Sequence, residues 1–362
     1  MNHLLVTGGA GFIGANFVHY WLGQHPDTNL VVLDALTYAG NPSNLSQIAP
    51  SANYRFVHGD ICDSELVADL LTQESIDCIV HFAAESHVDR SITGPDEFVR
   101  TNVVGTHSLL KSARSAWSVD GRIRPEVRFH HVSTDEVYGS LTSDAAAFTE
   151  STSYSPNSPY SASKAGSDHL VRSYHHTFGL PVTTTNCSNN YGPYQFPEKL
   201  IPLMLVNALD GKALPVYGQG LNVRDWLYVE DHCRAIELVL ASGRVGETYN
   251  VGGRNEIRNI DIVHSLCSML ESKFKNDPTL GTRFPRCPAA QGRAISELVS
   301  FVTDRPGHDW RYAIDCRKIE EELGFRLNEQ FSSGLSKTVD WYLENEAWWR
   351  TVQSGQYRVL ST

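Results

Sequence analysis

The sequence contains no long apolar run, no basic run and no CxxC cysteine pair. A membrane-spanning helix needs roughly 18 consecutive apolar residues, and no stretch reaches that length, so we expect no membrane partner. The formal net charge is -11 and the pI is about 5.7. A protein that binds a nucleic-acid backbone needs a basic face, so we expect no nucleic-acid partner either.

The seven cysteines are odd in number and widely spaced, which argues against a disulfide framework or a zinc site. None of the 15 histidines stands in an HExxH or similar spacing, so no metal site is expected. The chain starts directly with an apolar strand pattern and shows no signal-peptide leader. Together these features predict a cytoplasmic protein with reduced thiols.

The chain has 362 residues, of which 41% are hydrophobic and 20% charged, a globular composition. Apolar runs of strand length alternate with longer segments of helical spacing through the first half. This alternation predicts an α/β fold, a Rossmann-type doubly wound parallel sheet covered on both faces. The predicted strands are 3–7, 29–34, 54–58, 78–84, 127–133 and 181–186, and the predicted helices are 11–24, 65–73, 95–116 and 159–178.

From about residue 187 the alternation breaks, and Pro, Gly and aromatic residues become frequent. We therefore expect an NAD-binding domain at 1–186, with returning segments near 226–251. Residues 187–362 are expected to form a smaller, mixed α/β domain that mainly binds substrate. The stretch 289–302 suggests no role of its own.

The motif TGGAGFIG places Gly8, Gly11 and Gly14 between a predicted strand and a predicted helix. Glycines there permit a tight turn and let backbone N–H groups approach a pyrophosphate at the helix N-terminus. A glycine-rich structural turn would give the same spacing. Asp34 weakens that alternative, because a carboxylate at the end of the second strand accepts hydrogen bonds from ribose hydroxyls and repels a 2′-phosphate. The pattern favours NAD over NADP.

Tyr160 and Lys164 are four residues apart in YSASK, so both share one face of the helix that Ser158 and Pro159 are expected to begin. A lysine beside a tyrosine lowers the pKa of the phenol and makes it a usable base. With the hydroxyl of Thr134, the pair forms a proton-transfer set for alcohol and ketone chemistry. YxxxK alone is common by chance.

Two adjacent carboxylates, Asp135 and Glu136, follow the fifth predicted strand. Ser133 and Glu136 fit a helix-capping box, although Gly139 follows at once and no apolar helical run does. A solvated loop with incidental acids is a second explanation. A third is acid and base chemistry by two groups whose surroundings separate their pKa values.

Ten motifs over essentially the whole chain resemble the dTDP-glucose 4,6-dehydratases, a family of the extended short-chain dehydrogenase/reductases. The matching motifs are TGGAGFIG (7–14), LTYAGN (36–41), GDI (59–61), HFAAESHVDRSI (81–92), STDEVYG (133–139), YSASK (160–164), NNYGPYQFPEKLIP (189–202), NVRDWLYVEDH (222–232), YNVGG (249–253) and DRPGHDWRY (304–312). Ala35 departs from the pattern, since many members carry a lysine there.

The resemblance implies conversion of dTDP-glucose to dTDP-4-keto-6-deoxyglucose and water, for rhamnose-type deoxysugar biosynthesis. Tyr160 and Thr134 would act at the C4 hydroxyl, Glu136 would remove the C5 proton, and Asp135 would protonate the departing C6 hydroxyl. The resemblance also implies a homodimer in which helices 95–116 and 159–178 form a four-helix bundle.

The residues expected at the sites come from the motifs above together with the resemblance. The cofactor set is Gly8, Gly11, Phe12, Ile13, Gly14, Asp34, Asp60, Ile61, Ala83, Ala84, Thr101, Tyr160, Lys164 and Asn190. The substrate set is Ser86, Thr134, Asn189, Lys199, Leu200, Pro215, Tyr217, Arg224, Asn259, Asp304, Arg305 and His308, with Arg224 the leading pyrophosphate ligand.

Three alternatives to this reading stay open. The chain would otherwise be a 4,6-dehydratase for UDP- or CDP-hexoses, a related UDP-sugar epimerase or decarboxylase, or a non-enzymatic NAD-binding regulator. The acid pair argues against an epimerase, and the intact Thr134, Tyr160 and Lys164 set argues against a regulator.

Overall fold

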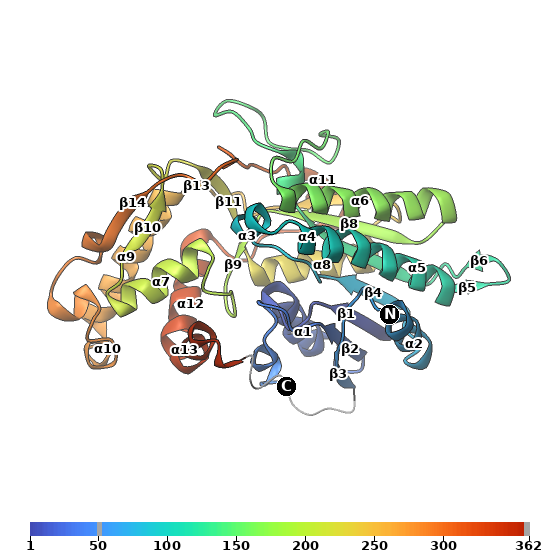
Figure 1. The fold of residues 1–362 in the computed structure, drawn as a ribbon, viewed down its shortest axis with the longest axis horizontal. Coiled ribbons are helices and arrows are strands. Elements are labelled where there is room, and N and C mark those ends of the chain that lie inside the picture. Colours follow the sequence, from blue (N-terminus) through green and yellow to red (C-terminus); the bar gives the residue numbers. More distant parts are fainter. Residues whose placement is uncertain (49–52, 358–362) are drawn as a thin grey trace.

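A seven-stranded, all-parallel sheet forms the centre of the N-terminal part of the molecule (Figure 1). The computed structural model describes residues 1–48 and 53–357. The expected Rossmann-type fold is confirmed. In spatial order the strands are β12 (Thr248–Val251), β8 (Val182–Cys187), β7 (Arg128–Thr134), β4 (Cys78–His81), β1 (His3–Thr7), β2 (Asn29–Asp34) and β3 (Tyr54–His58).

Alternate residues of the central strands enter two separate apolar cores, one on each face of the sheet. Leu5 and Val31 pack with helices α2, α5 and α6, whereas Leu4 and Val32 pack with helices α1 and α8. This period of two is the expected consequence of strand geometry, and both faces must be apolar because helices cover both. These helices are α1 (Phe12–Gln24), α2 (Ser64–Gln73), α5 (Thr106–Ala116), α6 (Pro159–Phe178) and α8 (Val229–Ser242).

The fourth strand is shorter than predicted, because β4 ends at His81 and not at residue 84. His81 pairs with Thr7, the last residue of β1, so the sheet ends there for both strands. The chain beyond His81 leaves the sheet and enters the short helix α3 (Val88–Thr93).

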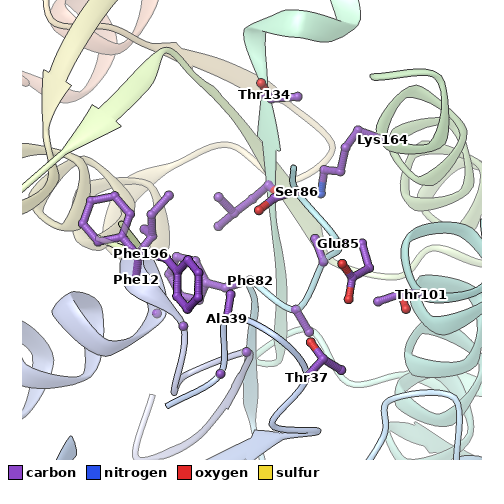
Figure 2. A pocket seen from close by; sticks show the side chains of 18 of the residues that line it. Phe12, Thr37, Ala39, Phe82, Glu85, Ser86, Thr101, Thr134, Lys164 and Phe196 are labelled. Atoms are coloured by element: carbon purple, nitrogen blue, oxygen red, sulfur yellow. Dashed lines mark hydrogen bonds between the residues drawn. The ribbon is translucent and has the colours of Figure 1, made fainter. Parts of the chain in front are cut away.

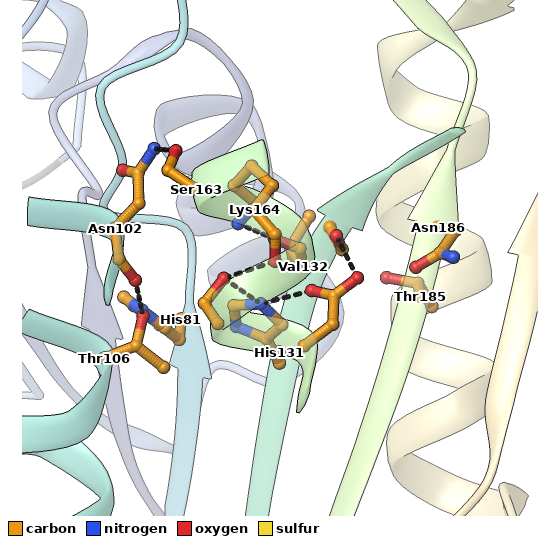
Figure 3. Close-up of polar contacts among 12 residues, drawn as sticks. His81, Asn102, Thr106, His131, Val132, Ser163, Lys164, Thr185 and Asn186 are labelled. Atoms are coloured by element: carbon orange, nitrogen blue, oxygen red, sulfur yellow. Dashed lines mark hydrogen bonds and ion pairs between the residues drawn. The ribbon is translucent and has the colours of Figure 1, made fainter. Parts of the chain in front are cut away.

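The prediction of one continuous α-helix over 95–116 is wrong. A short helix α4 (Asp96–Phe98) runs into a π-helix, η2 (Val99–Gly105), before α5 begins. The amide of Asn102 bonds outward, accepting from the backbone N–H of Glu85 at 2.9 Å and donating to Ser163 at 2.8 Å (Figure 3). π-Helical turns are frequent at functional sites, and this one joins helix α6 to the loop after β4.

Residues after 187 build a separate apolar core of their own, and part of this half of the chain returns to the large sheet. Helix α8 packs against α1, and β12 pairs with β8 at the sheet edge. In Figure 1 the remaining elements gather on the far side from α2 and α5. They are β9 (Asn189–Tyr191), β10 (Leu214–Tyr217), β11 (Val223–Tyr228), β13 (Glu256–Arg258), β14 (Val299–Val302), α7 (Leu200–Asp210), α9 (Asn259–Asn276), α10 (Thr279–Arg283), α12 (Phe331–Glu344) and α13 (Glu346–Ser354). Helix α11 (Arg317–Leu323) instead packs against β12 and α8.

The stretch 289–302, to which the sequence assigned no role, packs into the C-terminal core and ends in a strand. Ile295 is fully buried in that core. Strand β14 then pairs in parallel with β10, so that Pro215 lies opposite Ser300 and Tyr217 opposite Val302. This stretch therefore supports the strand that carries Pro215 and Tyr217.

Minor elements complete the described chain, and none of its helices is long and apolar enough to cross a bilayer. They are a hairpin of β5 (Ser118–Val119) and β6 (Arg122–Ile123) and the 3-10 turns η1 (Pro42–Leu45), η3 (Asp135–Tyr138), η4 (Pro288–Gln291) and η5 (Ile295–Leu298).

Candidate functional site

A deep cleft opens at the carboxyl ends of β1, β4 and β7, the edge at which ligands bind in parallel α/β sheets. The volume of this cavity is about 310 Å³. Every residue predicted for the cofactor and every residue predicted for catalysis lines this cleft. Figure 2 shows Phe12, Thr101, Thr134 and Lys164 among the side chains around it.

The glycine turn after β1 leaves no room for side chains. Gly8 has φ +70°, and a Cβ there would lie 2.6 Å from the backbone nitrogen of Ala83. A Cβ on Gly14 would lie 2.2 Å from the carbonyl oxygen of Gly8. Helix α1 begins at Gly11 without a side-chain cap, so its first N–H groups and its positive dipole end face the cleft. The turn is a cradle for a phosphate group.

The carboxylate of Asp34 closes this cradle at the end of β2. It accepts hydrogen bonds from the backbone N–H groups of Ala10 and Leu36, both at 2.8 Å. Burial raises the pKa of Asp34, and the two amides oppose that shift. Each carboxylate oxygen keeps acceptor capacity for a ribose hydroxyl. The glycine cradle and this acidic residue therefore fit a dinucleotide such as NAD.

Asp60, predicted to reach the adenine, is held by a residue that the sequence did not single out. Arg100 of the π-helix donates to its carboxylate at 2.7 Å, and the backbone N–H of Cys62 donates at 2.8 Å. The arginine is half exposed at the rim of the cleft. Arg100 therefore lies with Asp60 at the same end of the cleft.

Tyr160 and Lys164 lie in the first turns of α6, as the sequence predicts. Ser158 and Ser161 form a reciprocal capping box, and Pro159 occupies the first helical position. The ammonium of Lys164 is 4% exposed and donates to the carbonyl of Val132 at 2.8 Å (Figure 3). This hydrogen bond fixes the lysine against the end of β7.

The expected lowering of the pKa of Tyr160 by Lys164 is wrong for the cleft as it stands. Burial of the phenol raises its pKa well above the usual value, and the nearby Glu136 carboxylate raises it further. A hydrogen bond with Thr134 opposes these effects. The ammonium of Lys164 is engaged with a backbone carbonyl. A phenolate at Tyr160 therefore needs positive charge close by.

The two acids after β7 begin the 3-10 turn η3, whose cap is Thr134 and not Ser133. The hydroxyl of Thr134 accepts from the N–H of Glu136 at 3.3 Å, so the capping explanation is partly correct. Asp135 is 1% exposed, and within the described chain its Oδ2 has no hydrogen-bond partner. Burial raises the pKa of Asp135 well above its usual value, and the neighbouring Glu136 adds to this. Both effects favour the protonated form of Asp135.

Glu136 lies in a different electrostatic environment. Burial raises the pKa of its carboxyl, but Lys199, Arg305 and Arg224 each lower it. Those three cations favour the ionised form of Glu136, whereas Arg224 and a hydrogen bond from Thr134 oppose the raised pKa of Asp135. Neighbouring carboxyls whose surroundings shift their pKa values to different extents can provide an acid and a base at one position.

The predicted substrate residues divide into two groups. Ser86, Thr134, Asn189 and Lys199 line the cleft, and the Lys199 ammonium donates to the carbonyl of Ser86 at 2.9 Å. The others lie outside its lining: Leu200, Pro215, Tyr217, Arg224, Asn259, Asp304, Arg305 and His308.

Arg305 and Tyr217 of this second group meet on one carboxylate, that of Asp89 in helix α3. Arg305 donates to it at 3.0 Å and the Tyr217 hydroxyl at 3.2 Å. His308 pairs with Asp304 at 2.6 Å. These contacts connect the loop after β14 to the N-terminal domain beside the cleft.

Arg224, the leading pyrophosphate ligand from sequence, is 5% exposed and satisfied by backbone carbonyls. Its guanidinium donates to Val223 at 2.7 Å and to Asp309 at 2.9 Å, and lies 4.2 Å from the ring centre of Tyr312. Its charge still acts on Glu136. Its role in phosphate binding stays a prediction.

Several buried polar atoms of the predicted substrate residues have no partner among residues 1–48 and 53–357. They are Oδ1 of Asn189, Oδ1 of Asn259 and Nε of Arg305. Buried polar atoms in native proteins are nearly always hydrogen-bonded, so atoms left without a partner indicate ligand contacts. These three support a polar ligand at this site.

The sequence analysis missed other residues of the cleft that stand inside the quoted motifs. The ring of Tyr38 lies 3.9 Å from the guanidinium of Arg90, which pairs with Glu198 at 3.3 Å. Glu198 also lines the cleft. Figure 2 also shows Thr37, Phe82, Glu85 and Phe196 around the cavity. The family motifs that contain these residues were the only sequence signal that could have pointed to them.

No group of three or more His, Cys, Asp and Glu side chains is placed to hold a metal ion in the described part of the chain.

Comparison with known proteins supports one assignment. Residues 5–338 match the family model described as GDP-mannose 4,6 dehydratase. The chain is 55% identical over 357 residues to dTDP-glucose 4,6-dehydratase of Xanthomonas campestris pv. campestris (strain B100), covering 98% of this chain and 97% of the relative. It is 51% identical over 364 residues to dTDP-glucose 4,6-dehydratase 1 of Escherichia coli (strain K12), covering 98% and 96%.

Among solved structures, the fold matches dTDP-glucose 4,6-dehydratase DesIV of Streptomyces venezuelae, which was solved with NAD bound. The TM-score is 0.85 at 50% sequence identity, over 97% of this chain and 99% of that chain.

Proposed function

Because the chain belongs to the GDP-mannose 4,6-dehydratase family, we propose that it is an NAD-dependent dTDP-glucose 4,6-dehydratase. It converts dTDP-glucose to dTDP-4-keto-6-deoxyglucose and water, a step that serves deoxysugar biosynthesis of the rhamnose type. Relatives of this name align over nearly the full length of both chains.

One observation carries the proposal: Asp135 and Glu136 lie in the same cleft as Thr134, Tyr160 and Lys164. Together with the hydride chemistry that a bound NAD would supply, a tyrosine, a lysine and a hydroxyl suffice to oxidise an alcohol or reduce a ketone. An added acid and base are needed only when the reaction also removes a proton and a hydroxyl group. The pair therefore supports elimination in addition to redox chemistry.

At C4, Tyr160 takes the proton of the sugar hydroxyl while Thr134 hydrogen-bonds the same oxygen. Burial disfavours a phenolate, so this state requires positive charge nearby, and the proposal assigns that charge to Lys164, four residues along the same helix face. NAD, held by the glycine cradle and Asp34, supplies the acceptor and later the donor of the hydride. The C4 ketone acidifies the neighbouring C5 proton.

At C5 and C6, Glu136 acts as the base and Asp135 as the acid. Glu136, whose ionised form the surrounding cations favour, removes the C5 proton. Asp135, whose protonated form burial favours, gives its proton to the C6 hydroxyl, which leaves as water. The hydride then goes to C6 and C5 is reprotonated, so the cofactor ends unchanged.

The nucleotide part of the substrate is assigned to the C-terminal domain. Lys199, Arg224 and Arg305 carry the positive charge that a pyrophosphate requires. The unpartnered oxygens of Asn189 and Asn259 support contacts to the substrate. We assign the strand containing Pro215 and Tyr217 to the nucleobase, and residues 1–186 to the cofactor.

The test is incubation of the purified protein with dTDP-, UDP-, CDP- and GDP-hexoses, followed by mass spectrometry. The expected result is loss of one water from dTDP-glucose. Water loss from UDP-glucose alone would rule out the dTDP assignment. Rapid interconversion of sugar epimers without water loss would rule out a dehydratase.

The protein is further proposed to be a cytoplasmic homodimer. Val99 and Val104 on the π-helix are 52% and 51% exposed, and Phe178 at the end of α6 is 38% exposed. Apolar side chains on two adjacent helices support an isologous four-helix interface. All seven cysteines are free, which suits a reducing compartment. Light scattering after size exclusion should give twice the chain mass of 40.2 kDa, and a monomer would contradict the dimer.

A further inference from the structure

Asp168 is a buried carboxylate that the proposed chemistry does not use. It lies on α6, four residues after Lys164 and therefore on the same helix face. Its exposure is 6%. An ionised side chain so deep in a protein is costly unless it is paired or hydrogen-bonded.

Three donors converge on this carboxylate from outside α6. The Ser133 hydroxyl donates at 2.8 Å, the Tyr154 hydroxyl at 3.0 Å and Nε2 of His131 at 3.0 Å. Ser133 and His131 belong to β7, the strand that leads directly into Thr134, Asp135 and Glu136. Figure 3 shows His131 and Lys164 within this buried polar network. Hydrogen bonds of this kind stabilise the charged form of a carboxylate.

His131 donates its hydrogen bond to Asp168 as a neutral imidazole. Burial lowers the pKa of His131 well below its usual value. An ionised carboxylate only accepts hydrogen bonds, so the ring proton resides on Nε2. Consistently, Nδ1 of His131 has no hydrogen-bond partner in the described residues. His131 thus brings no charge to the network.

Lys164 faces the opposite difficulty: within the described residues its buried ammonium donates a hydrogen bond to a neutral carbonyl, that of Val132. Burial lowers the pKa of Lys164, and Asp168 gives the largest opposing effect, followed by Cys187. Burial raises the pKa of the Cys187 thiol to about 12, so this group is uncharged at neutral pH. Asp168 is therefore the anion that offsets the buried ammonium.

The other titratable groups around the pair are neutral or exposed. His81 on β4 has a pKa lowered well below normal by burial, and the pKa values of Tyr154 and Tyr160 are raised by burial. His169, next to Asp168 on α6, is exposed to solvent. Lys164 and Asp168 are thus the two buried charges of this region.

We propose that Asp168 is a positioning residue, the buried counter-ion that keeps Lys164 charged and ties α6 to the active-site end of β7. Substrate and cofactor do not touch it in this role. It acts on the chemistry through Lys164, which supplies the charge for the Tyr160 phenolate, and through Ser133, the residue before Thr134. The effect of Asp168 on the rate of dehydration rests on the proposed function, whereas its effect on the charge of Lys164 is independent of that function.

The sign of the pH dependence follows from the carboxyl itself. Burial raises the pKa of Asp168 to about 6, with Lys164, Ser133 and Tyr154 opposing that shift. Above this pH the carboxylate is charged and supports the ammonium. As the pH falls through about 6, Asp168 gains a proton and Lys164 loses its counter-ion.

The first test measures the charge of Lys164 in the protein without cofactor or substrate. Lysines are labelled with 13C at Cε, and the Lys164 signal is assigned by its absence in Lys164→Met. Asp168→Asn should lower the titration midpoint of Lys164 by about one pH unit or more, a tenfold loss of proton affinity. An unchanged midpoint overturns the proposal, whatever the enzyme acts on.

The second test is the pH profile of kcat/KM with dTDP-glucose. Tyr154→Phe removes one hydrogen-bond donor to Asp168 but keeps the carboxylate. The pKa of Asp168 should therefore rise, and the acid limb near pH 6 should move to higher pH. Asp168→Asn should lower the rate at neutral pH and abolish that limb. Equal losses at every pH in both variants would indicate a structural role and overturn the proposal.

Two outcomes separate this proposal from the proposed function. If wild-type protein does not dehydrate dTDP-glucose, the function is wrong, and the Lys164 titration still decides the role of Asp168. If Asp168→Asn does not fold, the Tyr154→Phe profile decides, because an acid limb identical to wild type overturns the proposal.

Discussion

Asp135 and Glu136 are consecutive in the chain but occupy different electrostatic environments. Asp135 is buried, and within residues 1–48 and 53–357 one of its carboxyl oxygens has no partner. Glu136 lies within the influence of Lys199, Arg305 and Arg224. Two adjacent carboxyls with the same surroundings would have similar pKa values and would not divide into an acid and a base. The proposed mechanism therefore gives them different roles, Asp135 as proton donor and Glu136 as proton acceptor.

The glycine cradle should tolerate no side chain at Gly14. Gly14→Ala places a Cβ 2.2 Å from the carbonyl oxygen of Gly8, a backbone atom that cannot move without opening the turn. We expect NAD affinity to fall at least tenfold, about 1.4 kcal/mol, measured by calorimetry. Gly23→Ala on the same helix is the matched control, because its Cβ meets nothing within 4 Å. Equal NAD affinity in both variants would contradict the cradle.

Tyr160→Phe should remove the proton acceptor at C4 while leaving the fold intact. A positioned acid or base contributes about 10²–10⁴-fold, so kcat should fall by that factor with little change in KM. The rate of water loss from dTDP-glucose is the measurement. Tyr174→Phe, on the same helix but outside the cleft lining, should keep wild-type activity. A Tyr160→Phe enzyme with wild-type kcat would exclude this role.

Asp89 should compete with the substrate for Arg305. The two side chains are paired at 3.0 Å, and a pyrophosphate bound by Arg305 has to replace that contact. Asp89→Asn should therefore tighten dTDP binding. Ion pairs exposed to this degree are worth up to about 1 kcal/mol, so the gain in Kd is at most about fivefold.

The comparison variant is Asp69→Asn, which removes one exposed carboxylate on α2. Its Kd for dTDP should equal that of wild type. Weaker binding by Asp89→Asn would mean that Asp89 assists the substrate and does not compete with it.

The sheet and the cofactor cradle could be predicted because both depend on local pattern. Apolar runs ending in glycine mark the buried strands, and Gly8, Gly11 and Gly14 occupy fixed positions between strand and helix. The cofactor residues follow at the carboxyl ends of those strands, which meet at one edge of the sheet. The sequence order alone therefore brings them together.

Features that depend on contacts between distant segments were not predicted. Asp89 and Arg305 pair across 216 residues, and Asp60 and Arg100 across 40, without any periodic signal. The π-helical turn at 99–105 has apolar spacing compatible with an ordinary helix. The raised pKa of Tyr160 depends on burial and on the position of Glu136, which appear only after folding.

The most direct test of the account is rapid mixing of dTDP-glucose with Glu136→Gln and Asp135→Asn enzymes in heavy water. Cofactor reduction is followed by absorbance, and water loss and C5 deuteration by mass spectrometry. Asp144→Asn, on an exposed loop, serves as the control. In Glu136→Gln, cofactor reduction should proceed while C5 deuteration and water loss fall by about 10²–10⁴-fold. In Asp135→Asn, water loss should fall although C5 exchange continues. Elimination at the wild-type rate in either variant would contradict the division of roles between Asp135 and Glu136.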